Sequence, residues 1–408
     1  MNPSVEKVII PSSDDPFKGG GVGGKHTHIR LLASGLENLG VKVGTIYPHE
    51  TVGFKLITRY PGALSRRLVT SKEKRVESWG QEKLELLRRS VRESDLDCQV
   101  LNPQDTLSLQ VVASEMERRK VHIPMVLTVH GYYVREMVSA EGLDPTSPSV
   151  EKQLQEELSS YALASRIICV DSRIRDYISN QANIDRERME VLPNAVDTLT
   201  FHPLPGPGMK ALRRSLDVPG EAKILLCPRR LVPKNGVEFA IRAMAPITKK
   251  HPEAILLIAG DGPQRSHLHK VIADFGLEGH IILLGSVPHR TIPSYFQCSD
   301  IVLIPSTPSF GVEEATSLSM LEGMACGKPV IVSNIGGLKE TITDGVNGFK
   351  VSAGDPDAIA ERVIYIFDHK DVRESIALSG LEYVRKNHSH LVHAQKVLSQ
   401  YKLAVRND

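Results

Sequence analysis

Glu314 and Glu322 have the spacing and surroundings of a ligand site. The apolar run 301–305 precedes them and the apolar run 330–333 follows, which is the pattern of a strand, a loop with a helix, and a second strand. The spacing Glu-x7-Glu is a little over two helical turns, so both carboxylates can approach one ligand if the loop becomes helical by Glu314. Open α/β sheets bind ligands in a crevice at the carboxyl ends of their strands. Carboxylates there can accept hydrogen bonds from the hydroxyls of a ribose or a sugar.

A basic turn offers charges of the opposite sign. Arg229, Arg230 and Lys234 lie between an expected strand at 224–227 and an expected helix at 236–250. Guanidinium groups make forked contacts with phosphate oxygens, and an ammonium adds a movable point charge. The turn therefore suits a diphosphate, with a solvated surface turn as the alternative.

The first half of the chain contains a glycine-rich loop and a strand-ending histidine. The loop 19–24 has five glycines before an expected helix at 26–39, and such a backbone can approach a phosphate closely. Because the loop does not directly follow the first strand and no acidic residue ends the second strand, a nicotinamide cofactor is not expected. His130 ends the apolar strand 125–129, where a role in a cleft competes with a core or capping role.

Composition excludes several classes of protein. The 408 residues are 41% hydrophobic and 24% charged with a net charge of +2, so nothing favours nucleic-acid binding. No apolar run approaches the roughly 20 residues of a membrane span, and the first residues lack a signal-peptide pattern, so we expect a cytoplasmic protein. The 5 cysteines have no metal-binding spacing and are expected to be free thiols. Asp95 and Asp97 form a D-x-D string at the amino end of an expected strand, the wrong edge for a ligand, so no metal site is expected.

Strands and helices alternate along the whole chain, which predicts an α/β fold with mainly parallel sheets. The alternation restarts near residue 198, and the Pro/Gly-rich run 203–208 is interpreted as a linker. We therefore expect two Rossmann-like domains, an acceptor-binding one at 1–197 and a nucleotide-sugar-binding one at 198–385. A helix at 386–408 is expected to pack back toward the first domain. Helix 313–326 is expected to carry both glutamates.

These motifs, in this order, resemble the family-4 retaining glycosyltransferases of GT-B fold. The resemblance extends over nearly the whole chain, and the Glu-x7-Glu region is its strongest part. Further support comes from the segments 193–197 (Pro-Asn-Ala-Val-Asp), 259–263 (Ala-Gly-Asp-Gly-Pro), 284–287 and 347–349. It implies two Rossmann-like domains with parallel sheets facing across a central cleft, and an enzyme that uses a nucleotide-sugar without a metal or other cofactor.

The resemblance also implies roles for particular residues. Glu314 would hold donor-sugar hydroxyls, Glu322 the ribose, and His130 the sugar near its C6 group. The residues that it assigns to catalysis are His130, Glu314, Arg230 and Lys234. The residues that it assigns to donor binding are Gly23, Gly24, Arg229, Arg230, Lys234, Val287, Glu314, Leu318 and Glu322, where Gly23 and Gly24 close on the phosphate and the backbone of Val287 meets the base.

The chain departs from the family pattern at two places. Asn235 stands where the family has a lysine before the glycine of the basic turn, so either Lys234 reaches round or Arg229 substitutes for it. Ser309 stands where the family has a glutamate before Phe-Gly, and Glu314 follows after a longer loop.

The expected function is transfer of a sugar from a UDP- or GDP-sugar to a hydroxyl acceptor in a glycan, a lipid-linked molecule or a small molecule. A nucleotide-sugar 2-epimerase and a non-catalytic nucleotide-sugar-binding protein are the alternatives. The basic stretch 51–94 could contact an anionic membrane, which would place the protein at its inner face, or could be a solvated surface.

Overall fold

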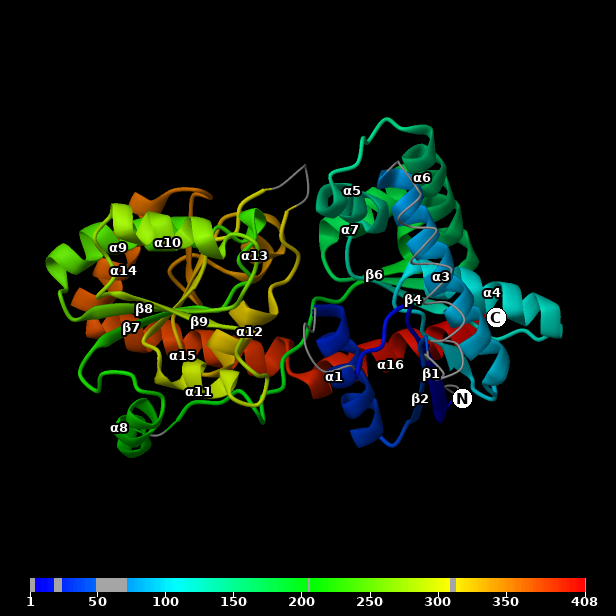
Figure 1. Cartoon of the computed structure of the whole chain (residues 1–408). Helices are drawn as coiled ribbons and strands as arrows, with labels where there is room; N and C mark the ends of the chain where they lie inside the picture. Colours follow the sequence, from blue (N-terminus) through cyan, green and yellow to red (C-terminus); the bar gives the residue numbers. More distant parts are fainter. Residues whose placement is uncertain (1–3, 18–23, 49–71, 205, 309–312, 408) are drawn as a thin grey trace. The chain divides into compact units, whose positions relative to one another are not determined.

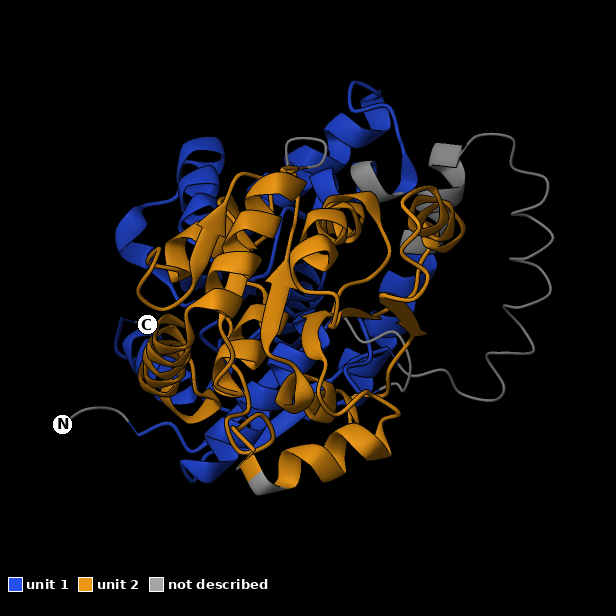
Figure 2. Cartoon of the chain, turned by 90° about the vertical axis from the view of Figure 1, so that its left-hand side faces the viewer, with its two compact units in different colours: residues 1–193, 393–408 blue, residues 194–392 orange. Residues whose placement is uncertain are grey.

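The computed structural model describes residues 4–17, 24–48, 72–204, 206–308 and 313–407 (Figure 1). The chain divides into two compact units, coloured separately in Figure 2. Unit 1 comprises Met1–Pro193 and His393–Asp408, and unit 2 comprises Asn194–Val392. Within the described ranges, no helix combines the length and the apolar character needed to cross a membrane.

Unit 1 has two three-stranded parallel sheets with the orders β2-β1-β3 and β4-β5-β6. A single parallel bridge between Leu101 and Met125 connects them. The strands are β1 (Lys7–Pro11), β2 (Lys42–Ile46), β3 (Val100–Leu101), β4 (Val126–Val129), β5 (Arg166–Cys169) and β6 (Met189–Val191). The helices are α1 (Gly24–Asn38), α3 (Lys72–Glu93), α4 (Thr106–Arg119), α5 (Tyr133–Glu141), α6 (Pro148–Ser160), α7 (Ser172–Ala182) and most of α16 (His390–Asn407).

The last helix, α16, completes the core of unit 1. Its buried side chains Val397 and Tyr401 share one apolar cluster with Ile10 of β1 and with Ile29 and Leu36 of α1. These residues are at most 1% exposed, so the inward-facing side of α16 is as deeply buried as the first strand. Residues separated by almost the full length of the sequence therefore form one core.

Unit 2 contains one six-stranded parallel sheet with the order β12-β11-β10-β7-β8-β9. Its strands are β7 (Lys223–Cys227), β8 (Ala254–Ala259), β9 (Ile281–Gly285), β10 (Ile301–Ile304), β11 (Val330–Ser333) and β12 (Phe349–Val351). Its helices are α8 (Gly206–Ser215), α9 (Val237–Lys250), α10 (Arg265–Asp274), α11 (Ile292–Cys298), α12 (Leu318–Ala325), α13 (Gly336–Thr341), α14 (Pro356–Asp368) and α15 (Lys370–Asn387). The strand order reverses between β7 and β10, and such a switch point is where doubly wound sheets bind ligands.

The predicted α/β alternation with parallel sheets is confirmed, and two local predictions are wrong. The run 203–208 is not a linker between the units, because it lies inside unit 2 and α8 begins at Gly206. Proline and glycine fit a helix start as well as a linker. The N–H groups of the first helical turn have no acceptor within the helix, so the N–H that proline lacks is not needed there. The helix expected from residue 313 begins at Leu318, so only Glu322 is helical.

Candidate active site

The loops after β7 and β10 meet at the switch point of unit 2. Gly236, which follows the basic turn, has φ +61°, and a Cβ there would lie 1.9 Å from the carbonyl oxygen of Pro305 at the end of β10. The backbone N–H of Thr307 donates to the carbonyl of Lys234 at 2.8 Å. Only glycine permits this approach, so the two loops that carry the expected site residues are held in contact.

Arg229 is the centre of this contact. The residue is 9% exposed and its Nη2 lies 2.8 Å from Glu314 Oε2. The same nitrogen is 2.7 Å from Asn235 Oδ1 and 2.9 Å from Ser306 Oγ, while Nη1 is 3.2 Å from Ser317 Oγ. The guanidinium is thus used inside the protein, between the loops after β7 and β10.

The Arg229 contacts give a physical reason for the asparagine that departs from the family pattern. Asn235 is 5% exposed and its Nδ2 donates to the carbonyl of Arg230 at 2.8 Å. A lysine at this position would bring a second cation next to the Arg229 guanidinium. Lys234 is partly exposed and Arg230 is exposed, so these two cations are the ones that can meet a ligand from solvent.

Glu314 lies in the loop before α12, and its position does not come from helical geometry. Its backbone carbonyl accepts from Gly337 N at 2.9 Å, and its carboxylate pairs with Arg229. Burial raises the pKa of this carboxyl, but the charge and hydrogen bond of Arg229 together with the charges of Lys234 and Arg230 outweigh burial, so the pKa is lowered. Glu314 is therefore ionised at neutral pH and can accept hydrogen bonds.

Glu322, on α12, is in the opposite electrostatic state. Burial raises its pKa to about 7. No side chain in the described part of unit 2 offers it a cation, which agrees with burial being the sole cause of the shift. Among the described residues, no charged group offsets this effect of burial on the Glu322 carboxyl.

The remaining expected residues of unit 2 are spread along neighbouring elements. Leu318 is the first residue of α12, and Val287 follows β9 and packs on the apolar cluster that includes β7 and β10. Two of the resemblance motifs are explained by packing instead. A Cβ at Gly262 would lie 2.5 Å from the carbonyl oxygen of Leu231, and the Asn347 side chain bonds backbone groups of the turn 341–343.

Asn194, from the segment that precedes unit 2's first strand, supports the Glu314 loop. Its Nδ2 donates to the carbonyl of Thr316 at 3.1 Å, and its own carbonyl lies 3.1 Å from His388 Nδ1. The motif 193–197 therefore stabilises the loop between Glu314 and α12.

In unit 1, His130 follows β4 and is partly buried. Its Nε2 lies 3.0 Å from Gln104 Oε1, and the His28 ring of α1 packs edge-on with centroids 4.6 Å apart. Burial lowers the pKa of His130 well below its usual range, and the nearby His28 and Lys25 lower it further. Gly24 is the first residue of α1, and Gly23 lies outside the described residues.

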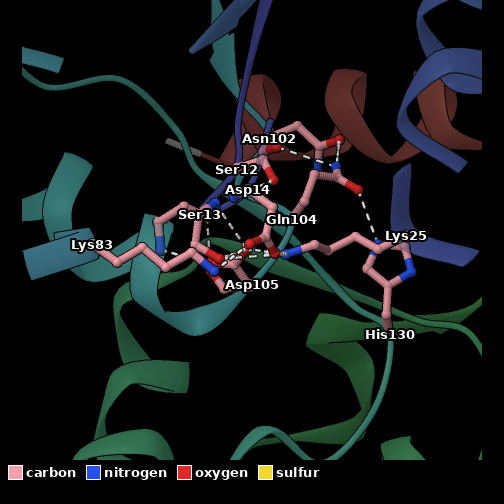
Figure 3. Close-up of polar contacts among 10 residues, drawn as sticks. Ser12, Ser13, Asp14, Lys25, Lys83, Asn102, Gln104, Asp105 and His130 are labelled. Carbon is pink, nitrogen blue, oxygen red and sulfur yellow. Dashed lines mark hydrogen bonds and ion pairs between the residues drawn. The ribbon is translucent and has the colours of Figure 1, made fainter. Parts of the chain in front are cut away.

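A charged cluster lies at the start of α1 (Figure 3). Lys25 Nζ is 2.6 Å from Asp14 Oδ2 and 2.9 Å from Asp105 Oδ2, and Lys83 also pairs with Asp14. Asp105 caps α4 by accepting from Ser108 N at 2.7 Å. Lys25 is therefore occupied by two carboxylates and anchors the start of α1.

Three other expectations concern metal binding and surface charge. Among the described residues, no group of three or more His, Cys, Asp or Glu side chains is arranged to hold a metal ion. Asp97 of the D-x-D string pairs with Lys7 on the surface at 2.9 Å. Most of the basic stretch 51–94 lies outside the described residues or in the part of α3 whose side chains are not described.

Sequence reasoning missed the residues that support the site. The ion pair between Arg229 and Glu314, the contact of Gln104 with His130, and the contact of Tyr401 with Asn102 join distant segments, with separations of 85, 26 and 299 positions. The one signal available was Asn102 and Gln104 at the end of an apolar strand, where polar side chains face a ligand edge or each other.

Two family profiles match the chain and cover most of it. The profile described as Glycosyltransferase Family 4 matches residues 22–199, and the profile described as Glycosyl transferases group 1 matches residues 209–382. The chain belongs to the family-4 glycosyltransferases of GT-B fold. The resemblance drawn from the motifs is thereby confirmed.

Relatives agree with this assignment. An uncharacterised glycosyltransferase of Methanocaldococcus jannaschii is 28% identical over 388 residues, which are 94% of this chain and 95% of that protein. A GDP-mannose-dependent alpha-(1-6)-phosphatidylinositol monomannoside mannosyltransferase of Mycolicibacterium smegmatis is 33% identical over 177 residues, 43% of this chain and 46% of that protein.

Solved structures show the same fold. Sucrose-phosphate synthase from Thermosynechococcus elongatus has a TM-score of 0.75 at 19% identity, over 99% of this chain and 100% of that one. Anabaena HepE in complex with UDP has a TM-score of 0.69 at 19% identity, over 97% of this chain and 98% of that one. The predicted GT-B fold class is confirmed.

The Arg229 contacts predict a contrast between adjacent arginines. Arg229→Gln leaves the partly buried Glu314 without its ion-pair partner, so we expect the free energy of unfolding to fall by about 3 kcal/mol. Arg230→Gln removes an exposed charge and should change it by less than about 0.5 kcal/mol. Urea denaturation of both variants at pH 7 measures the difference, and similar small losses would contradict a buried ion pair.

The raised pKa of Glu322 predicts a pH-dependent stability. Because the folded-state value of about 7 exceeds the ordinary 4.5, the folded chain binds more protons between these values and loses stability as pH rises through them. The glutamine of Glu322→Gln cannot ionise. Without ligand this variant should therefore be more stable than the wild type at pH 8 by about 1–3 kcal/mol, because each pKa unit corresponds to roughly 1.4 kcal/mol. At pH 4 the two should be equal. A difference of the same size at both pH values would show that ionisation is not its cause.

Proposed function

We propose that this glycosyltransferase is a retaining enzyme that takes its sugar from a nucleoside diphosphate and passes it to a hydroxyl acceptor. The observation that carries the proposal is the ion pair of Arg229 with Glu314, which holds an ionised carboxylate beside the accessible cations Arg230 and Lys234. A carboxylate accepts from sugar hydroxyls, and the cations attract a diphosphate. A nucleotide-sugar presents both groups a short distance apart.

The proposed donor is a UDP- or GDP-sugar. The mycolicibacterial relative is named as GDP-mannose-dependent, and HepE has been crystallised with UDP and with UDP-glucose. In this proposal Glu322 binds the ribose, because the two vicinal ribose hydroxyls can donate hydrogen bonds to its carboxyl. Val287 backbone groups and Leu318 lie near the base.

The proposed reaction breaks the bond between the anomeric carbon and the diphosphate oxygen and forms a bond from that carbon to the acceptor oxygen. The leaving diphosphate gains negative charge, which Arg230 and Lys234 stabilise as preorganised cations. The acceptor's proton passes to the leaving phosphate oxygen on the same face of the sugar. Configuration is then retained without a protein nucleophile.

We propose that the diphosphate is neutralised by these side chains without a metal ion, and that no other cofactor takes part. The acceptor is proposed to be a hydroxyl of a glycan, a lipid-linked molecule or a small molecule. Contact with an anionic membrane surface through the basic stretch 51–94 belongs to the same proposal.

Two other functions fit the family less well. A non-catalytic nucleotide-sugar-binding protein would bind the donor without turnover, and a 2-epimerase would convert the donor without an acceptor. The ordered Glu314 and the two accessible cations favour transfer over both.

The test is a set of incubations with UDP- and GDP-sugars whose anomeric carbon is labelled with ¹³C, with and without hydroxyl acceptors. We expect an α-linked donor to give an α-linked product by NMR, with activity unaffected by EDTA. A β-linked product would overturn retention, and loss of activity restored by Mn²⁺ or Mg²⁺ would overturn metal independence. Binding without any product, or a changed donor without acceptor, would favour the alternatives.

Lys234 provides a second test, on the transition state. If it stabilises charge that grows as the donor bond breaks, Lys234→Ala should lower kcat by about 10²-fold and raise the donor KM much less. Lys270→Ala, an exposed lysine on α10, is the matched control and should leave both unchanged. Wild-type kcat in Lys234→Ala would assign the diphosphate to Arg230 alone.

A further inference from the structure

A chain of buried hydrogen bonds links α16 to His130 through unit 1, and Figure 3 shows its central part. Tyr401 Oη donates to Asn102 Oδ1 at 2.9 Å. Gln104 Nε2 donates to the same Asn102 oxygen at 2.6 Å, and Gln104 Oε1 lies 3.0 Å from His130 Nε2. Asn102, Gln104 and Tyr401 are each at most 1% exposed, so water cannot substitute for these contacts.

A backbone carbonyl sets the direction of every bond in this chain. Asn102 Nδ2 donates to the carbonyl oxygen of Val126, which can only accept, so the Asn102 amide nitrogen faces β4 and its oxygen faces the other way. That oxygen can only accept, so Gln104 must present its NH₂ group to Asn102 and its carbonyl oxygen to His130. The Gln104 oxygen can only accept in turn. His130 must therefore carry a proton on Nε2.

The second ring nitrogen follows from the surroundings of His130. Lys25 and His28 of α1 and His393 of α16 oppose a positive charge on the ring, as burial does, and they and burial outweigh Asp105 before α4, which favours the charge. The ring is consequently neutral at physiological pH. With its proton on Nε2, Nδ1 has the free lone pair and is the hydrogen-bond acceptor.

We propose that Asn102 and Gln104 are positioning residues that hold His130 in the Nε2–H tautomer, so that Nδ1 accepts a hydrogen bond from a hydroxyl of the bound sugar. Tyr401 completes the network from the last helix without setting its direction. The ligand chemistry rests on the proposed function, whereas the tautomer depends on unit 1 alone. The direction of the bond matters because a site that accepts from a hydroxyl discriminates against a sugar that lacks it.

The spectroscopic test needs no substrate. Long-range ¹H–¹⁵N NMR of protein with ¹⁵N-labelled histidine distinguishes protonated from unprotonated ring nitrogens, and the His130→Gln spectrum assigns the signal. We expect His130 to show a protonated Nε2 and an unprotonated Nδ1 between pH 6 and 8. A protonated Nδ1 in the neutral wild-type ring would overturn the proposal.

Variants test the role of the network. Gln104→Leu removes the acceptor, so His130 should populate both tautomers. Gln104→Glu keeps the acceptor and adds a negative charge, so Nε2 should stay protonated and the ring should titrate at higher pH. Tyr401→Phe removes a hydrogen-bond donor to Asn102, but the carbonyl of Val126 still orients the Asn102 amide. This variant should therefore lower the stability of the protein and keep the Nε2–H tautomer of His130. An unchanged His130 signal in both Gln104 variants, with the fold intact, would overturn the positioning role.

Kinetics separate this inference from the proposed function. Gln104→Leu should lower kcat/KM for the sugar donor by about 3- to 10-fold, the value of one neutral hydrogen bond, and leave the inhibition constant of the free nucleoside diphosphate unchanged. An equal loss for both ligands would indicate general disruption and contradict the inference. If no sugar donor is turned over while the tautomer is as expected, the proposed function fails and the Nε2–H assignment stands.

Discussion

The ion pair between Arg229 and Glu314 is the interaction on which the switch-point geometry of unit 2 depends. A buried carboxylate without a cation is costly, and this one belongs to a loop with no helix to hold it. Arg229 supplies the charge and, by also contacting Asn235 and Ser306, connects the loops that follow β7 and β10. One guanidinium therefore positions both the acidic and the basic halves of the site, which explains why a second buried cation is absent from position 235.

Glu314 and Glu322 show how two carboxyls of unit 2 can be held in opposite protonation states. Arg229 lowers the pKa of the first, while burial raises that of the second to about 7. The unliganded protein gains stability from the first arrangement, and the second lowers its stability as pH rises from about 4.5 to about 7. A carboxyl kept at such a cost is typical of a site that receives its hydrogen-bond donors from a ligand.

In unit 1, hydrogen bonds rather than an ion pair fix the orientation of the His130 ring. The side-chain amides of Asn102 and Gln104 each have an oxygen that accepts and a nitrogen that donates. The backbone carbonyl of Val126 therefore determines the orientation of both amides and the tautomer of His130. Tyr401 belongs to α16, whose part in unit 1 follows all of unit 2 in the sequence. The environment of His130 is consequently complete only when both ends of the chain are in place.

The sequence by itself determined the elements and the edge of the sheet on which the chemistry lies. Apolar runs such as 301–304 predict buried strands, and residues that follow them, including Arg230 and His130, must lie at the carboxyl edge of a parallel sheet. The tertiary structure alone decided which side chains are free to meet a ligand. Arg229 and Arg230 are adjacent and chemically identical, yet one is buried against Glu314 and the other is exposed. The start of α12 at Leu318, the use of 203–208 inside unit 2 and the tautomer of His130 likewise depend on contacts between distant segments. Local patterns do not encode such contacts, because burial and hydrogen-bond direction are properties of the assembled fold.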